Sequence, residues 1–181
     1  MIARTKQILL TPDEAWREIE GERLSPVALL LNYALPLAAI GPAALALRAH
    51  FFDLPTPPLR GLALVAAGTA LNLAAAACIA IAAMFVSAVL GGKRDLRNAL
   101  ALSFYSATPL WLSSVSILFP EQAVFAIVVF GALMYGLYLF YLGLHALLKV
   151  PQDDAGIATA IVITLAMVAF GGLGWGFAWV V

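Results

Sequence analysis

Residues 122–148 read QAVFAIVVFGALMYGLYLFYLGLHALL and contain no Asp, Glu, Lys or Arg. A helix of this stretch, at about 1.5 Å per residue, is long enough to cross the hydrocarbon core of a bilayer, which is about 30 Å thick. Four further stretches are also free of charge: 24–47, 61–92, 98–120 and 155–181. Because lipid offers the backbone no hydrogen-bond partner, each stretch must pair its own backbone groups as a helix. The sequence therefore predicts an all-α membrane protein.

The composition supports a single membrane domain. Hydrophobic residues make up 64% of the chain and charged residues 11%, whereas soluble domains average about 45–50% and about 25%. We expect a cytoplasmic segment at residues 1–23, followed at 24–181 by a polytopic bundle of five transmembrane helices. The expected spans lie at about 26–48, 60–91, 97–118, 122–148 and 155–180.

The basic residues indicate how the bundle is oriented. Eight of the ten Lys and Arg residues lie before the first span or in the turns after the second and fourth spans. The other two, Arg48 and Arg60, flank the loop after the first span. Because Lys and Arg favour the cytoplasmic side of a membrane, we expect the amino terminus inside and the carboxy terminus outside.

A short amphipathic helix is predicted to begin at Thr11 and to end at Gly21. Thr11 precedes Pro12 and stands three residues before Glu14, which is the arrangement of a capping box. Its apolar side carries Trp16. Two interpretations are open: the helix lies in the headgroup region with Trp16 as its anchor, or it docks on the cytoplasmic end of the bundle. No cleavable signal peptide is expected before it.

Prolines are predicted to kink two of the spans. Pro36 and Pro42 in the first span and Pro109 in the third each leave a backbone carbonyl without its helical donor. One interpretation is a kinked helix whose free carbonyls are satisfied nearby, and the other is a broken helix that exposes backbone to a small solute or ion. Polar side chains close enough in sequence to satisfy these carbonyls are Asn32, Ser106 and Thr108.

Uncharged polar residues near mid-membrane depth are expected in the bundle interior. In the fourth span, Tyr138 and Tyr141 share a face with His145. That arrangement suits either a proton relay or an interfacial histidine within an aromatic belt. The candidate residues for a polar interior or conduit are Asn32, Asn72, Thr108, Tyr135, Tyr138 and His145.

Small residues of the second span predict close helix packing. Ala76, Ala80, Ala83 and Ser87 follow one another at spacings of four, three and four. Rows of small side chains let helices approach closely in lipid. They serve either contacts within the bundle or a homo-oligomer.

The sequence offers little for chemistry. No charged residue lies in the middle of a span, which argues against a proton-coupled carrier. Neither a hydrolase motif nor a phosphate-binding glycine loop is present. Because the chain has two histidines in different regions and one cysteine, we expect no metal site, no cofactor and no enzymatic activity. A net charge of +0 gives no reason to expect nucleic acid binding.

Four short motifs carry a resemblance to a known family. They are Thr11-Pro12-Asp13-Glu14-Ala15-Trp16 before the first span, Tyr33-Ala34-Leu35-Pro36 within it, Phe104-Tyr105-Ser106-Ala107-Thr108-Pro109 in the third span, and Tyr135-Gly136-Leu137-Tyr138 to Gly143-Leu144 with Val150-Pro151 at the fourth. On these motifs, and over nearly its whole length, the chain resembles the Yip-one domain family, in particular its bacterial branch. The eukaryotic members carry a D-L-Y-G-P element before the first span, which is missing here, and a glycine where this chain has Phe104.

The resemblance implies a five-span protein of the bacterial cytoplasmic (inner) membrane, with a membrane-organising or adaptor role. Eukaryotic relatives are partners of prenylated Rab-type GTPases, and that partner is not carried over to this chain. We expect a non-enzymatic protein whose partners are membrane lipids and other membrane proteins or further copies of itself. The alternative is a conduit for a small solute, lipid or ion, built around the kinked first and third spans. The expected cytoplasmic contact surface comprises Trp16, Arg17, Lys93 and Arg94.

Overall fold

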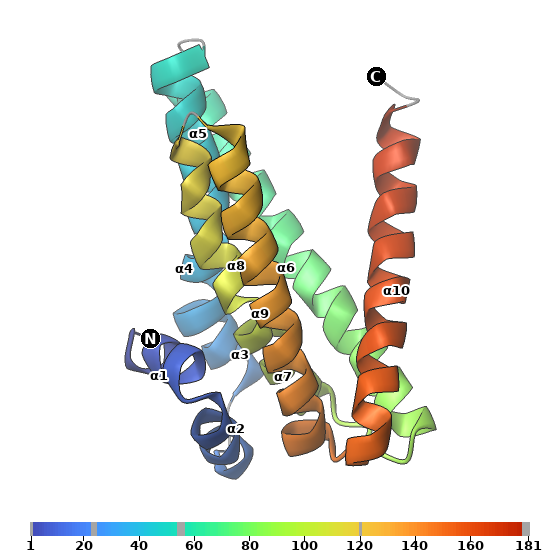
Figure 1. The fold of residues 1–181 in the computed structure, drawn as a ribbon. Coiled ribbons are helices and arrows are strands. Elements are labelled where there is room, and N and C mark those ends of the chain that lie inside the picture. The colour runs from blue at the N-terminus through green and yellow to red at the C-terminus, as the bar shows by residue number, and fades with distance from the viewer. Residues whose placement is uncertain (1, 23–24, 54–56, 120, 179–181) are drawn as a thin grey trace.

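The computed structural model describes residues 2–22, 25–53, 57–119 and 121–178, and it places the side chains of all of these except 52–53 and 168–178. The described residues form helices and no strand (Figure 1). In chain order the elements are α1 (Ile2–Leu10), α2 (Pro12–Gly21), α3 (Pro26–Leu29), η1 (Leu30–Ala34), α4 (Leu35–Ala38), α5 (Ile40–Arg48), η2 (Ala49–Asp53), α6 (Pro58–Val89), α7 (Leu96–Ser106), α8 (Thr108–Ser113), η3 (Ser114–Leu118), α9 (Gln122–Leu148) and α10 (Gln152–Ala178).

Four helical segments are long and apolar enough to cross a membrane: Pro26–Phe51, Pro58–Val89, Leu96–Leu118 and Gln122–Leu148. They match the first four predicted spans. The fifth predicted span falls on α10, whose side chains are described only as far as Met167, and residues 179–180 at its end lie outside the described part of the chain. An all-α membrane protein is therefore confirmed, and the count of five spans stays a prediction.

The first and third spans are segmented helices. In the first span, η1 is a π-helical turn that ends two residues before Pro36, and a second interruption at Ala39 precedes Pro42. In the third span, α7 ends at Ser106 and α8 begins at Thr108, beside Pro109. Each interruption lies just before a proline, because the proline ring removes one backbone donor and crowds the preceding turn.

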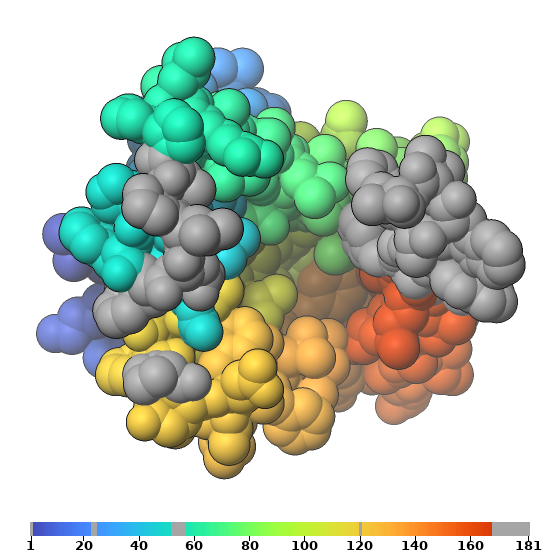
Figure 2. Space-filling view, turned by 90° about the horizontal axis from the view of Figure 1, so that it is seen from above, coloured from blue at the N-terminus to red at the C-terminus, as the bar shows by residue number. Residues whose placement is uncertain are grey.

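The helices are arranged with the N-terminal pair at one end of the bundle. Figure 1 shows α2, the α6–α7 turn and the α9–α10 turn at the same end, while α10 points toward the opposite end. Helix α10 contacts both α6 and α9. Seen from above, the surface is hollowed between α6, α9 and α10 (Figure 2). Which end faces the cytoplasm stays a prediction from the basic residues.

The predicted row of small residues on α6 lies inside the bundle. Ala76, Ala80, Ala83 and Ser87 are each at most 4% exposed, and α6 packs closely on α7. These short side chains permit that approach, and dispersion contacts then stabilise the pair in lipid. The row therefore serves the bundle interior. A homo-oligomer, if one forms, must use another surface.

The outer surface is apolar where the spans lie. Ile127 and Phe130 on α9 are 71% and 63% exposed, and Leu62 on α6 is 67% exposed. Such a continuous apolar surface would be unfavourable in water but is the normal surface of a helix in hydrocarbon. The fold thus requires a membrane around it.

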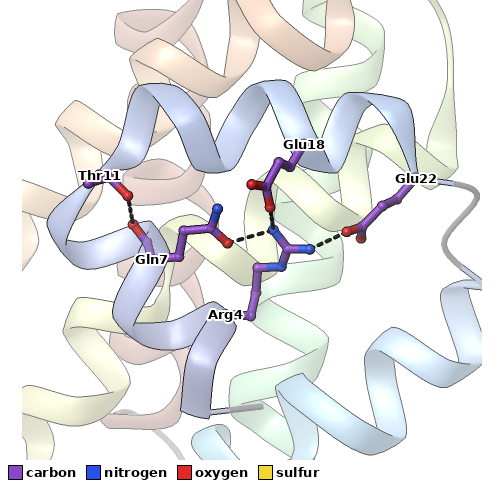
Figure 3. A network of polar contacts seen from close by, with 5 residues as sticks. All are labelled: Arg4, Gln7, Thr11, Glu18 and Glu22. Carbon is purple, nitrogen blue, oxygen red and sulfur yellow. Dashed lines mark hydrogen bonds and ion pairs between the residues drawn. The ribbon is translucent and has the colours of Figure 1, made fainter.

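The N-terminal helices form a hairpin that the sequence did not fully predict. The sequence predicts α2, whereas it does not predict the helix α1 that precedes it. Arg4 of α1 donates from Nη1 to Gln7 Oε1 at 2.9 Å and to Glu18 Oε2 of α2 at 3.0 Å, and its Nη2 pairs with Glu22 (Figure 3). A hydrogen bond from Gln7, and then the Arg4 guanidinium, hold the pKa of the exposed Glu18 carboxyl below its usual value.

The predicted capping box at the start of α2 is wrong. Thr11 makes no side-chain cap bond to α2, and its hydroxyl instead donates to the Gln7 carbonyl at 3.3 Å. The reason is α1 itself: Thr11 closes that helix as well, and its backbone N–H also bonds to Gln7 O, at 2.8 Å. The hydroxyl therefore satisfies the end of α1 rather than the start of α2.

Candidate functional site

An apolar cavity of about 440 Å³ lies between α6, the α7–α8 junction, α9 and α10. It exists because short side chains face one another across it, including Ala76 on α6, Ala132 and Gly136 on α9, and Ala166 on α10. Larger apolar side chains complete the wall, among them Leu110, Trp111, Leu133, Phe140, Val162 and Met167. Its volume falls within the range of about 300–1,000 Å³ that is usual for small-molecule pockets.

Polar groups at this cavity are few, and most are paired. The Asn72 amide donates to the Ala38 carbonyl at 2.9 Å, and the Ser103 hydroxyl donates to the Ala76 carbonyl at 2.6 Å. Ser106 is 6% exposed, and its hydroxyl has no hydrogen-bond partner among the described residues. The cavity is therefore suited to hydrocarbon rather than to water or an ion.

The pairing of Asn72 explains how the bundle tolerates Pro42. A helical residue normally bonds the carbonyl four residues before it, so Pro42 leaves Ala38 O without that donor. Asn72 supplies the missing donor from α6. One turn earlier on α6, Gly68 makes room for the Pro42 ring, because a Cβ at Gly68 would lie 2.8 Å from Pro42 Cγ. The second span thus supplies both the donor for the free carbonyl and the space for the proline ring of the first span. The sequence instead suggests, as the donors, polar side chains that lie near the proline along the chain.

Replacing Asn72 with alanine is expected to lower the free energy of unfolding by about 1 kcal/mol, since interhelical hydrogen bonds in membranes contribute about 0.6–2 kcal/mol. In a Pro42→Ala background the backbone N–H of residue 42 can bond Ala38 O, so the same change should have less than half that effect. Thermal unfolding of the four variants in detergent measures this double-mutant cycle. Equal effects in both backgrounds would contradict the assignment.

Two of the predicted interior residues tie distant segments together. Thr108 is fully buried, and its hydroxyl lies 2.8 Å from Tyr33 Oη of the first span. The Tyr135 hydroxyl donates to the Leu9 carbonyl of α1 at 2.8 Å. Asn72 lines the apolar cavity, but neither Thr108 nor Tyr135 does. These side chains therefore hold helices together in the described part of the chain, and they are not gathered into one conduit.

The other three candidates for a polar interior lie at the surface, which for His145 agrees with the interfacial one of its two interpretations. Asn32 is exposed on the outside of the first span, and Tyr138 is 47% exposed on α9, so neither belongs to a polar interior. His145 is also at the surface, where its Nδ1 lies 2.9 Å from the Val150 carbonyl. The sequence placed Asn32 and Tyr138 wrongly because depth in the membrane does not say which side of a helix faces lipid.

Trp16 does not form part of an exposed contact surface. It is 1% exposed, and it packs edge-to-face on Tyr105 of α7 with ring centroids 6.2 Å apart. Of the two interpretations of α2, docking on the bundle is the one that the structure adopts, because the apolar side of α2 faces α9. Arg17, Lys93 and Arg94 are exposed, and Arg94 lies 4.6 Å from the centroid of the Phe85 ring.

The described residues contain no group of three or more His, Cys, Asp or Glu that could hold a metal ion. No curated protein and no solved structure matches the chain. Residues 6–173 match the family model of the Yip1 domain. That match covers α2 and all four apolar helical segments, together with most of α10. The chain belongs to the Yip1 domain family of membrane proteins.

Proposed function

We propose that this protein is a non-enzymatic membrane protein that organises lipid by holding one acyl chain between α6, α9 and α10. The observation that carries this proposal is the apolar cavity of about 440 Å³, which lies between α10 and three helical segments that are long and apolar enough to cross a membrane. We place the protein in the bacterial cytoplasmic membrane, as its resemblance to the bacterial branch of the family suggests. The distribution of Lys and Arg supports an amino terminus inside and a carboxy terminus outside.

An acyl chain fits the physical character of the cavity. An empty apolar cavity forfeits the dispersion contacts that its lining would make with an occupant. Water would gain few hydrogen bonds there, because the polar groups at the wall are mostly paired. A flexible hydrocarbon chain from the surrounding bilayer restores the dispersion contacts, and among the lining hydroxyls of Ser103 and Ser106 only that of Ser106 has no partner in the described part of the chain. Holding such a chain is one way in which a small helical bundle can order the lipid around it.

The conduit alternative has less support. A passage for ions or small solutes needs convergent polar groups, as found where broken helices line a cavity. Here Asn72 and Tyr135 each donate to a backbone carbonyl of a neighbouring segment, and Thr108 is fully buried. The second candidate function is an adaptor role, since Arg17, Lys93 and Arg94 present cationic groups on the exposed surface.

Filling the cavity tests the proposal. The double substitution of Ala132→Leu and Ala166→Leu is expected to lower the amount of co-purifying phospholipid by about threefold or more, because the larger side chains occupy the space of the chain. Native mass spectrometry of protein released from mild detergent measures bound lipid directly. The matched control is Ala126→Leu with Ala160→Leu, which adds the same atoms to the same two helices at exposed positions. Equal lipid retention by the two double variants would refute the proposal.

A further inference from the structure

A second cavity, of about 380 Å³, lies where α2 packs on the last turns of α9. It is on the opposite side of α9 from the apolar cavity. Leu133, Gly136 and Leu137 face the apolar cavity, whereas Leu142 and Lys149 face this second one, and at about 100° per residue these two sets point in opposite directions. The two cavities are therefore independent sites.

Charges of both signs surround this second cavity. Asp13, Arg17 and Glu20 come from α2, and Lys149 follows α9. Lys149 pairs with Glu20. In the described part of the chain, neither Asp13 nor Arg17 takes part in an ion pair. One carboxylate and one guanidinium, four residues apart on α2 and hence on the same side of it, are thus left for a ligand.

Further polar groups lie around this pair. Trp16 is one of the lining residues; it is 1% exposed, and its buried Nε1 has no partner among the described residues. His145 is positioned by the contact of its Nδ1 with the Val150 carbonyl at 2.9 Å. Because a carbonyl can only accept, that Nδ1 carries the proton, and Nε2 is left to interact with a ligand.

We propose that this cavity binds the phosphoethanolamine headgroup of a membrane phospholipid. The Arg17 guanidinium faces the phosphate, for which its planar set of donors is suited. The Asp13 carboxylate accepts hydrogen bonds from the ammonium group. With its proton on Nδ1, the His145 ring presents Nε2 as an acceptor, which suits the ammonium group rather than the phosphate. A headgroup with one charge of each sign matches the two unpaired charges of α2.

Other headgroups match these charges less well. An anionic headgroup such as phosphoglycerol would pair with Arg17 but leave Asp13 facing a second negative charge. A phosphocholine headgroup offers no N–H to the carboxylate, and its recognition depends on open aromatic faces. One Trp and one Tyr line the cavity, and Trp16 cannot provide such a face, because it is packed against Tyr105 and beside Gly143. Tyr141 is then the one phenol or indole ring left among the described lining residues, whereas a quaternary ammonium is held by a cage of several aromatic faces. The cavity thus favours a primary ammonium.

The location agrees with this ligand. The cavity is lined by Gln152, the first residue of α10, as well as by α2 and the end of α9. This is the end of the bundle where the α6–α7 and α9–α10 turns lie (Figure 1). Turns between membrane-spanning helices lie at the level of the lipid headgroups. A phospholipid of the surrounding bilayer can therefore bring its headgroup to the cavity without leaving its layer.

The test is a lipid competition with the full-length protein. Native mass spectrometry compares retention of phosphatidylethanolamine, phosphatidylcholine and phosphatidylglycerol that carry identical acyl chains. The expected result is about a tenfold preference for phosphatidylethanolamine, which Arg17→Gln and Asp13→Asn each reduce to about twofold or less. Glu14→Gln, at an exposed position on the same helix but outside the cavity lining, should keep the preference.

Two further measurements distinguish a lipid headgroup from the free phosphoethanolamine molecule, and distinguish this proposal from the proposed lipid-organising function. Soluble O-phosphoethanolamine should compete only weakly, because it lacks the membrane anchoring of the lipid. If it competes as well as phosphatidylethanolamine, or if the wild-type protein shows no preference, the proposal is overturned. It is also overturned if the preference survives both Arg17→Gln and Asp13→Asn. The Ala132→Leu and Ala166→Leu pair should lower total lipid and leave the headgroup preference unchanged.

Discussion

Replacing Trp16 with alanine is expected to detach α1 and α2 from the bundle and to lower the free energy of unfolding by about 3–5 kcal/mol. The indole is 1% exposed. It fills the space between Tyr105 on α7 and Gly143 on α9, so its removal leaves a cavity that neighbouring side chains cannot easily close. The remaining ties of the hairpin to the bundle, such as the bond from Tyr135 to Leu9 O at 2.8 Å, then bear the whole attachment.

Limited proteolysis and thermal unfolding in detergent measure the two consequences. Trypsin should cut Trp16→Ala faster than the wild-type protein at Lys6 and Arg17, which lie on α1 and α2. Glu14→Ala is the matched control, since it truncates an exposed side chain on the same helix and should change the unfolding temperature little. Unchanged cleavage and an unchanged unfolding temperature in Trp16→Ala would mean that α2 is held by other contacts.

Much of the fold follows from the absence of charge alone. The four stretches at 24–47, 61–92, 98–120 and 122–148 coincide with helical segments long enough to span a bilayer. In hydrocarbon the backbone N–H and C=O groups of each segment must form hydrogen bonds with one another, so an apolar stretch of this length is helical whatever its tertiary neighbours are. The prolines likewise indicated where the first and third spans are interrupted.

The site was harder to predict because it depends on which helices are neighbours. Local periodicity identifies the apolar side of α2, but a buried and a lipid-facing apolar side have the same composition. Asn32 and Asn72 illustrate this limit: both are amides within apolar spans, yet Asn32 is exposed and Asn72 caps a carbonyl of another helix. The apolar cavity arises from small residues on three helices, and no single segment of sequence signals it.

Gly68 shows which signal could have revealed one of these contacts. It stands four residues before Asn72, so both point to the same side of α6. A glycine beside an amide on one face of an apolar helix suggests close approach by a segment with a free carbonyl, and Pro42 leaves such a carbonyl. The adjacency of the first and second spans could have been inferred from that combination.

Alanine substitutions at two glycines of α9 are expected to change stability in opposite directions. At Gly143 a Cβ would lie 2.5 Å from Leu102 Cδ1 and 2.9 Å from Trp16 Cζ2. Both neighbours are buried, so the new methyl group must displace them, and overpacking of this kind lowers the free energy of unfolding by about 1–3 kcal/mol. At Gly131 nothing lies within 4 Å of the added Cβ. There the higher helix propensity of alanine should stabilise by up to about 1 kcal/mol.

The double substitution Gly143→Ala with Leu102→Ala separates steric crowding from other causes. Leu102→Ala alone should destabilise by about 2–5 kcal/mol. If the methyl group at position 143 lowers the free energy of unfolding because it meets Leu102, it should lower it less once that side chain is shortened. The double variant should therefore be destabilised by less than the sum of the two single substitutions. Unfolding curves of the wild-type protein, Gly143→Ala, Leu102→Ala and the double variant measure this cycle, and the curve of Gly131→Ala measures the opposite effect. A stabilising effect of Gly143→Ala would mean that α9 does not approach α2 and α7 this closely, and the docked position of the N-terminal hairpin would then have to be revised.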